Sequence, residues 1–389
     1  NILKAALADE KDAMIHTNCA TIMNRLGRAP EAEASARFAI DLDGSVAEAH
    51  CALGIALDAQ NRLNEAREAF ERAMDVRGDY LDASINLGNL LFRQGDFMAA
   101  AERFAAAVEA WPDNPMARTN LAIALRRLGE LATAEEQCQT VIAGHPSFAE
   151  AHNALGNVRR ELGDLPGAML CFEDALRLRP AYAEAEANLA AARFKSGDLA
   201  GAAAGYEGLI KRAPGFAEAH LGLGVVELAE GRLDRAEAAF RLAAKARPDF
   251  GEAWQNIVSA KGSALSDDDL MFLKKKAGDA QLTPADRVAF LFALGEALDA
   301  KGEFDAAFAA VADGNARRKA GLAADGRDFD ADQFDAAIET VVGTLNKEVL
   351  DHLHGVAANP ARMAFIVGMP RSGTTLLEQM VAAHPNVIS

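Results

Sequence analysis

A stretch near the end of the sequence carries the residue types that bind anions. It reads AFIVGMPRSGTTLLEQMVAAHP from residue 364 to residue 385. Gly368 and Gly373 allow the backbone to close around a phosphate group, and the unpaired N–H groups of a following helix point toward that group. Arg371 adds a positive, planar guanidinium, and two threonines after the second glycine add hydroxyl donors. The chemistry that this pattern predicts is the binding of a phosphate-like group.

Such a loop has to be positioned by a strand before it and a helix after it. Residues 364–367 are apolar and favour a strand, whereas residues 374–383 recover the spacing of a helix. The simplest alternative is a Gly-Pro turn that only connects the two elements. A second alternative is the P-loop of a kinase or nucleotidase, which shares the glycine spacing. That motif requires Lys where this chain has Thr374, so this alternative is disfavoured.

The run PRSGTT after a strand, with a helix that ends in His-Pro, resembles a loop of the sulfotransferase family. That loop holds the 5′-phosphosulfate of 3′-phosphoadenosine 5′-phosphosulfate (PAPS). The resemblance covers about the last 25 residues and is closest to tyrosylprotein sulfotransferases and to bacterial sulfotransferases with tetratricopeptide repeats. It implies a PAPS-dependent enzyme that moves a sulfuryl group to a hydroxyl of a protein or other acceptor and requires no metal.

The resemblance also implies a role for each residue of the loop. Arg371 is the catalytic residue, because it contacts the phosphosulfate and stabilises charge during transfer. The residues expected to bind PAPS are Pro370, Arg371, Ser372, Gly373, Thr374 and Thr375. The family's general base is a Glu a few residues past the stretch matched by His384 to Ser389. We therefore expect the catalytic domain to continue beyond Ser389 and the 389-residue chain to be inactive alone.

An internal repeat defines most of the chain before this loop. Units of 34 residues begin without insertion at Ala13, Ala47, Leu81, Pro115, Ala149, Ala183 and Ala217, and an eighth begins at Gly251. A Leu followed by a small residue, a later aromatic residue and a closing Pro recur in most units. This is the tetratricopeptide signature. We predict an all-α superhelix of antiparallel helix pairs with a concave inner surface, followed by the start of an α/β, P-loop-like sulfotransferase domain.

Four segments follow from these patterns. Residues 1–260 keep the repeat register, and residues 261–321 form irregular terminal helices and one more repeat-like unit. Within the second segment, helix starts are expected at Ser266 and at Thr283-Pro284. Residues 322–360 are a predicted linker and amphipathic helix, and residues 361–389 hold the first strand, loop and helix of the sulfotransferase domain.

Asparagines recur at the sixth place of five units. On the first helix of a pair, an Asn amide can donate to and accept from the backbone of an extended peptide. This arrangement is similar to the asparagine ladder of the O-linked N-acetylglucosamine transferases. The alternative is that these amides bond within or between helices. The predicted peptide-binding residues are Asn18, Asn86, Asn120, Asn188 and Asn256.

Four histidines also recur, at the fourth place of their units, but equivalent places in stacked repeats are about 10 Å apart, too far to share a metal. We expect His16, His50, His152 and His220 to be packing residues. Four cysteines, Cys19, Cys51, Cys138 and Cys171, lack CxxC spacing and are expected in the core.

The charge of the chain limits its partners. There are 40 Lys and Arg residues against 57 Asp and Glu residues, for a formal net charge of −17. This disfavours sequence-independent binding of nucleic acid. No apolar run approaches the length needed to span a bilayer, and we expect a cytoplasmic protein. Two functions stay open from the sequence: a sulfotransferase whose repeats capture the acceptor, and a repeat adaptor with an inactive C-terminal part.

Overall fold

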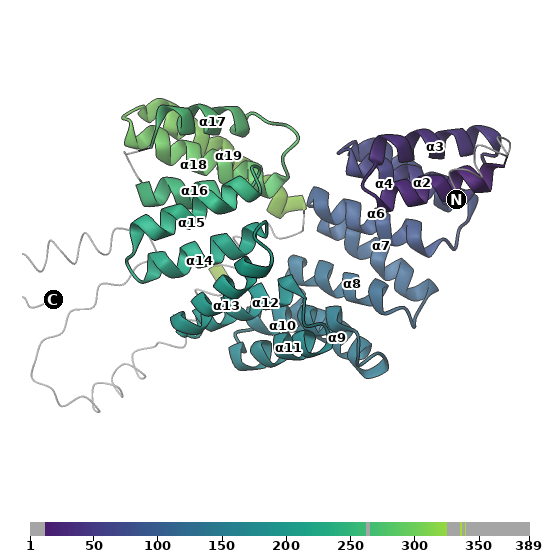
Figure 1. Cartoon of the computed structure of the whole chain (residues 1–389), viewed down its shortest axis with the longest axis horizontal. Helices are drawn as coiled ribbons and strands as arrows, with labels where there is room; N and C mark the ends of the chain where they lie inside the picture. The colour runs from purple at the N-terminus through teal and green to yellow at the C-terminus, as the bar shows by residue number, and fades with distance from the viewer. Residues whose placement is uncertain (1–11, 262–264, 325–334, 337–338, 340–389) are drawn as a thin grey trace, which may run out of the picture. The chain divides into compact units, whose positions relative to one another are not determined.

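A computed structural model describes residues 12–261, 265–324, 335–336 and 339 of the chain (Figure 1). The described residues contain eighteen α-helices, all before Asp328. The predicted phosphate loop, with Arg371, and the amphipathic helix predicted before it lie outside the described residues, apart from three positions of that helix.

The helices alternate along the chain as first and second members of antiparallel pairs. The first helix of each of the eight repeat units begins at the residue that the sequence predicted. The first helices are α2 (Ala13–Arg25), α4 (Ala47–Ala59), α6 (Leu81–Gln94), α8 (Pro115–Leu128), α10 (Ala149–Glu161), α12 (Ala183–Lys195), α14 (Ala217–Ala229) and α16 (Gly251–Lys261). The second helices are α3 (Ala29–Leu42), α5 (Leu63–Val76), α7 (Phe97–Ala110), α9 (Leu131–Gly144), α11 (Leu165–Leu178), α13 (Leu199–Arg212) and α15 (Leu233–Ala246). The predicted all-α repeat fold is therefore confirmed.

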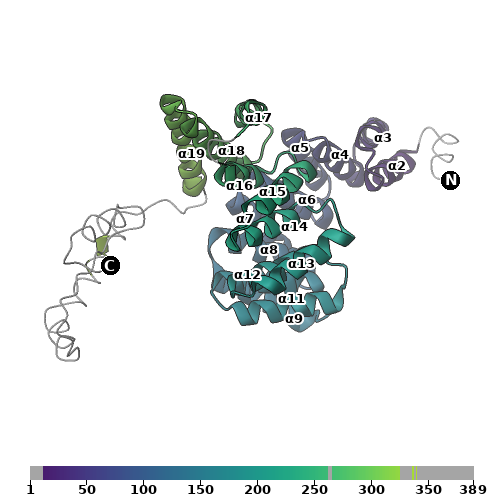
Figure 2. The same cartoon turned by 60° about the vertical axis from the view of Figure 1, so that its left-hand side comes forward.

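Four of the pairs bury a phenylalanine ring between their two helices. The rings of Phe70, Phe104, Phe172 and Phe240 all stand at the same place of their units, on the second helix, and each is at most 1% exposed. Small alanines surround them on both helices. Because one pair cannot cover its outer apolar face alone, successive pairs stack side by side, as both views show (Figure 1; Figure 2).

The first helices form the inner face of the array. Those of neighbouring units contact each other directly, from α2 with α4 through to α12 with α14. A side chain on one first helix can therefore reach the next, so polar side chains on this face are close enough to act together.

The turn inside each pair needs a residue with positive φ. Glycine supplies it in six units, at Gly27, Gly95, Gly129, Gly163, Gly197 and Gly231. The second unit instead has Asn61, with φ of 60°, and Asn61 is the single non-glycine residue with positive φ in the described part of the chain. Asn tolerates this conformation better than most residues, so the turn is kept.

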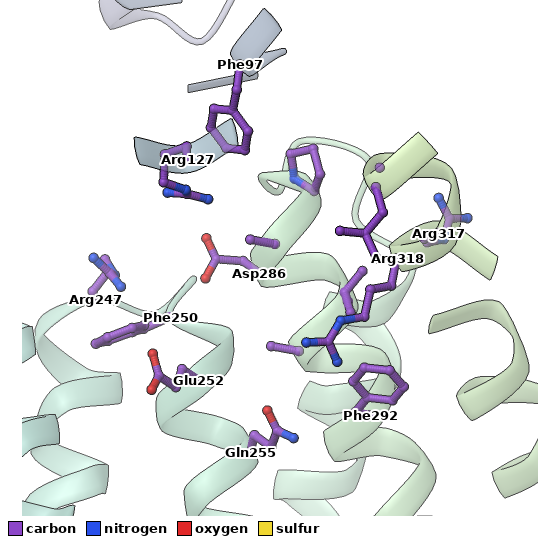
Figure 3. Close-up of a pocket in the computed structure, with 16 residues that line it drawn as sticks. Phe97, Arg127, Arg247, Phe250, Glu252, Gln255, Asp286, Phe292, Arg317 and Arg318 are labelled. Carbon is purple, nitrogen blue, oxygen red and sulfur yellow. The ribbon is translucent and has the colours of Figure 1, made fainter. Parts of the chain in front are cut away.

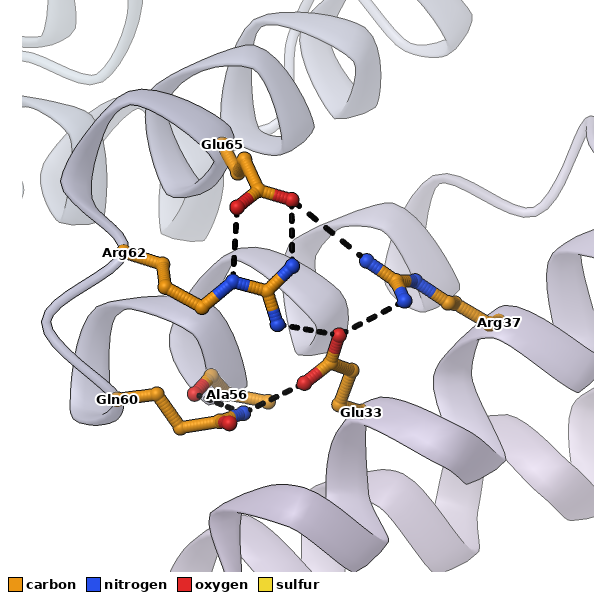
Figure 4. A network of polar contacts seen from close by, with 6 residues as sticks. All are labelled: Glu33, Arg37, Ala56, Gln60, Arg62 and Glu65. Carbon is orange, nitrogen blue, oxygen red and sulfur yellow. Dashed lines mark hydrogen bonds and ion pairs between the residues drawn. The ribbon is translucent and has the colours of Figure 1, made fainter.

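A polar network joins the first two pairs (Figure 4). The Glu33 carboxylate on α3 accepts hydrogen bonds from Gln60 at 2.7 Å and from Arg62 at 2.6 Å. Arg37 lies 2.9 Å from the same carboxylate, and Arg62 also pairs with Glu65. The Glu33 side chain is only 11% exposed, so its charge depends on these partners.

The array ends irregularly. The α17 helix (Asp267–Ala277) begins after Ser266, whose hydroxyl accepts from the Asp269 N–H at 3.1 Å. The α18 helix (Pro284–Ala300) begins after Thr283 in the same way. Both predicted helix starts are confirmed. The last described long helix, α19 (Phe304–Ala324), pairs with α18 and continues past the expected segment boundary at 321. In the described residues, none of the helices is both long and apolar enough to cross a membrane.

Candidate functional site

A groove on the inner face lies across the first helices of the first three units. Its volume is about 450 Å³. It is lined by Met14, Thr17, Asn18, Thr21, Asn24 and Arg25 from α2, by Glu48, Cys51, Ala52 and Ile55 from α4, and by Tyr80, Asp82 and Asn86 at α6. Two of the five predicted peptide-binding asparagines, Asn18 and Asn86, are therefore brought into one groove.

Two side-chain amides and two hydroxyls lie on the α2 wall of the groove. Asn18 is exposed in it. Asn24 donates to the Ala52 carbonyl at 2.8 Å, while its own side-chain oxygen is buried and accepts no hydrogen bond from any described residue. The Thr17 and Thr21 hydroxyls donate back to helix carbonyls, at 2.8 and 3.1 Å. The wall thus offers amide donors and acceptors rather than free hydroxyl donors.

The opposite wall is built around a buried thiol. Cys51 is 3% exposed, and the Asn86 amide donates to its sulfur at 3.9 Å. Burial raises the pKa of Cys51 to about 11, so the thiol stays protonated and is a weak nucleophile at neutral pH. Burial also raises the pKa of the Tyr80 hydroxyl. Both groups are therefore suited to hydrogen bonding rather than to proton transfer.

The rim of the groove is held by an ion pair. Arg77 lies 2.6 Å from Glu48 and 4.8 Å from the centre of the Tyr80 ring. Partial burial acts to raise the pKa of Glu48, but the hydrogen bond from Arg77, a backbone hydrogen bond and the charge of Arg77 together outweigh it, so the pKa is lowered. The same pairing recurs in two later units, as Glu150 with Arg179 and as Glu218 with Arg247. This pair is thus part of the repeat, and it fixes the orientation of Tyr80.

The other three predicted asparagines lie further along the inner face and are bonded to the protein. Asn120 donates to Asn89 at 3.2 Å, and Asn188 donates to Asn153 of the preceding unit at 2.9 Å. Asn256 donates to the Glu252 carbonyl of its own helix at 2.8 Å. Bonds within and between helices therefore occupy one donor of each of these amides. A role in peptide binding stays a prediction for all five asparagines.

The recurring histidines are packing residues, as predicted. His50, His152 and His220 each hydrogen-bond the backbone carbonyl six residues earlier, at 2.9 to 3.0 Å. His16 packs edge-on against Phe38, with ring centres 4.5 Å apart. Within the described residues there is also no cluster of three or more His, Cys, Asp or Glu side chains fit to hold a metal ion.

Sequence reasoning missed Asn24, Tyr80 and Cys51. One signal was available for Tyr80, because the last place of the unit is aromatic in five cases: Tyr80, Phe148, Tyr182, Phe216 and Phe250. Asn24 and Cys51 belong to no recurring pattern, so only the stacking of the helices shows that they meet.

Comparisons with known proteins agree with this fold. Tetratricopeptide-repeat models match residues 47–80, 85–147, 156–197 and 193–260. A sulfotransferase-family model matches residues 364–389. The chain therefore carries a tetratricopeptide-repeat array, followed by a short segment that is similar to the sulfotransferase family.

Similar proteins cover only parts of the chain. An uncharacterised protein of Aquifex aeolicus is 26% identical over 122 residues, which are 31% of this chain and 15% of that protein. Among solved structures, the Cut9–Hcn1 hetero-tetramer of the APC/C is 19% identical with a TM-score of 0.55, over 67% of this chain and 51% of that chain. YrrB, described as a TPR protein with an unusual peptide-binding site, is 24% identical with a TM-score of 0.38, over 48% of this chain and 95% of that chain.

Proposed function

We propose that the array captures an extended segment of a protein partner in the groove formed by α2, α4 and α6. The observation that carries this proposal is the convergence of Asn18, Asn24 and Asn86, from α2 and α6, on one groove of about 450 Å³. An Asn amide donates and accepts at once, as a peptide backbone does, so it can pair with a backbone of any sequence.

The groove favours binding over catalysis. Its thiol has a raised pKa, and its threonine hydroxyls are committed to helix carbonyls. The side-chain oxygen of Asn24 is the group that a bound peptide would stabilise most, because a buried acceptor without a hydrogen-bond partner destabilises the folded protein. A small rotation of the Asn24 amide toward the groove would let a backbone N–H of a bound peptide satisfy it.

The test is selection of ligands from a displayed library of random decapeptides on the complete chain. Peptides that bind the groove should lose affinity when Asn18 or Asn24 is replaced by Ala. They should keep it in Asn315→Ala, which removes an exposed amide from α19, outside the groove. If every selected peptide ignores Asn18→Ala and Asn24→Ala, the groove is not the binding site.

We further propose that residues 364–389 begin a sulfotransferase domain and that the array presents the captured acceptor to it. The match of residues 364–389 to the sulfotransferase family supports this. In the proposed reaction the acceptor hydroxyl oxygen bonds to sulfur, and the bond from sulfur to the 5′-phosphate oxygen of PAPS breaks. The hydroxyl proton passes to the general base, and 3′-phosphoadenosine 5′-phosphate leaves. Arg371 would stabilise the negative charge on that leaving phosphate.

The repeat array supports an adaptor without catalytic activity equally well. The shift in melting temperature caused by added ligands distinguishes an adaptor from a sulfotransferase. If the loop binds PAPS, the product 3′-phosphoadenosine 5′-phosphate should raise the melting temperature of the full-length protein more than ATP with Mg²⁺ does, because a ligand that binds the folded state stabilises it. The absence of any shift with the product would favour the adaptor. A larger shift with ATP and Mg²⁺ would favour a kinase-like loop.

A further inference from the structure

A second cavity, of about 710 Å³, contains four arginines, but its charges are balanced (Figure 3). Arg247 pairs with Glu218, and Arg317 pairs with Asp313. Two further carboxylates line the wall beside the remaining arginines. The cavity therefore has no excess positive charge that would attract an anion.

The inner face of the array carries an arginine whose charge is not balanced in this way. Arg160 is partly buried in the last turn of α10. Its guanidinium donates to the side-chain oxygen of Asn188 on α12 at 3.4 Å, which is long for a hydrogen bond, and it forms no ion pair with a described residue. Arg93 is the other described arginine whose pKa is lowered by burial, and it pairs with Asp58. Burial without a carboxylate partner thus distinguishes Arg160.

The groups around Arg160 leave one positive charge uncompensated. Arg126, on the neighbouring first helix α8, is 18% exposed and pairs with Glu161, so the Glu161 carboxylate is already in use. Burial lowers the pKa of Arg160 and repulsion by Arg126 lowers it further, whereas Glu161 opposes this shift. Burial raises the pKa of the nearby Tyr206 to about 12, so its hydroxyl stays protonated and adds no negative charge. A cation in such surroundings is stabilised by an added anion.

A neutral acceptor lies on the same face of α10. Asn157 stands three residues before Arg160, the spacing that puts two side chains on one face of a helix. Its amide donates to the Asn153 carbonyl at 3.2 Å, but its side-chain oxygen accepts no hydrogen bond from a described residue. One face of α10 therefore offers a guanidinium and an amide oxygen side by side.

We propose that α10 binds one acidic side chain of an extended segment of a protein partner. The carboxylate pairs with Arg160, and a neighbouring backbone N–H of the segment donates to the side-chain oxygen of Asn157. This site is separate from the groove of α2, α4 and α6 and does not depend on it.

The charge and the setting of Arg160 both favour this occupant. One carboxylate supplies the single negative charge that is missing, whereas a phosphate group carries up to two. The planar guanidinium also matches a carboxylate with two parallel N–H groups. First helices continue on both sides of α10, so a segment can run past Arg160 in both directions. This favours an acidic side chain over the carboxyl end of a chain.

The test uses three fluorescein-labelled heptapeptides on the complete chain, with binding followed by fluorescence anisotropy. The acidic probe is Ser-Ala-Leu-Glu-Val-Ala-Ser with an amidated carboxyl end, and its neutral match has Gln in place of Glu. The third peptide is the Gln peptide with a free carboxyl end. The acidic probe should bind about tenfold more tightly than either of the others, because charge-assisted hydrogen bonds are stronger than neutral ones.

Replacement of Arg160 should separate binding from folding. Arg160→Met keeps an apolar stem and removes the charge. The preference for Glu over Gln should fall to about onefold, while the melting temperature should stay unchanged or rise by about 2 °C, because an uncompensated charge is removed. Arg160→Lys keeps the charge without the planar fork and should retain a preference of about threefold. Arg177→Ala, on α11 and 70% exposed, is the control and should leave the tenfold preference intact.

Asn157→Asp should supply the missing carboxylate from within the chain. An Asp at this place can pair with Arg160 along the helix and occupy it. The preference for Glu over Gln should therefore fall below about twofold, and the melting temperature should rise by an amount that shrinks in 1 M salt. Asn157→Ala is the matched control, because it adds no charge and should weaken both amidated probes equally.

Four results would overturn the proposal: equal affinity for the Glu and Gln probes, a Glu preference that survives Arg160→Met, a clearly lower melting temperature in that variant, or equally tight binding of the peptide with a free carboxyl end. Asn18→Ala and Asn24→Ala, in the groove of the proposed function, should leave the Glu preference unchanged. The two sites can thus fail independently.

Discussion

Gly88 of α6 lies directly against the ring of Phe104 on α7, so that a Cβ at Gly88 would come within 2.4 Å of the ring carbon Cε1. The same contact joins Gly54 to Phe70 and Gly224 to Phe240. The two helices of a pair are therefore held at a distance that leaves no room for a methyl group.

Gly88→Ala should accordingly destabilise the protein by about 1 to 3 kcal/mol, the usual effect of overpacking a core. Gly208→Ala is the control, because Gly208 is also helical but has only the tip of Arg212 within 4 Å. There the change should stabilise by up to about 1 kcal/mol, through helix propensity. Urea denaturation of both variants measures the difference. Equal effects of the two substitutions on stability would show that the contact of Gly88 with Phe104 does not limit the distance between α6 and α7.

Acid should weaken the network around Glu33. Burial acts to raise the pKa of Glu33, but hydrogen bonds from Gln60 and Arg62 and the charges of Arg37 and Arg62 together outweigh it, so the folded-state pKa is lowered. The stabilisation is therefore present above the ordinary pKa of Glu, about 4.3, and is lost as the pH falls through the lowered value. Glu33→Gln should cost about 2 kcal/mol at pH 7. The difference from the parent protein should shrink below about pH 4. A difference that stays constant down to pH 3 would contradict this account.

The fold could be predicted from the sequence because the residue pattern of one helix pair recurs in successive 34-residue units. The period placed all eight first helices, and the Leu-Gly pattern that includes Gly88 marked where helices approach closely. The groove could not be predicted in the same way. Cys51 and Asn24 are single occurrences, and the contact between Asn61 and Gln281 joins positions 220 residues apart. Such contacts depend on the rotation that accumulates from unit to unit along the array. No local sequence pattern predicts that rotation.

The asparagines of the inner face should divide into two kinds. Asn188 donates to Asn153 at 2.9 Å and accepts from Arg160 at 3.4 Å, so Asn188→Ala should destabilise the array by about 1 kcal/mol. Asn18 is exposed, and Asn18→Ala should change stability by less than about 0.5 kcal/mol. Thermal unfolding of both variants distinguishes them. A loss in Asn18→Ala as large as in Asn188→Ala would indicate a structural role for both.

The proposed sulfotransferase activity makes a prediction for Arg371. In the full-length enzyme, Arg371→Ala should lower kcat about 100-fold or more, because the guanidinium stabilises charge that develops only in the transition state. Arg371→Lys should recover part of the loss, since Lys keeps the charge but not the planar fork. Turnover with PAPS and a hydroxyl acceptor is the measurement. An unchanged kcat in Arg371→Ala would exclude this role.

The central claim is that the groove of α2, α4 and α6 binds the backbone of a peptide through Asn18 and Asn24. Its most direct test is the affinity of one selected peptide for the complete chain after two kinds of change to the peptide. Methylation of single backbone nitrogens removes hydrogen-bond donors and should weaken binding about tenfold at two or more positions. Replacement of single side chains by Ala should change affinity less than about threefold, and Asn24→Ala in the protein should abolish the sensitivity to methylation at one of those positions. The account is contradicted if methylation has no effect while single side-chain replacements abolish binding.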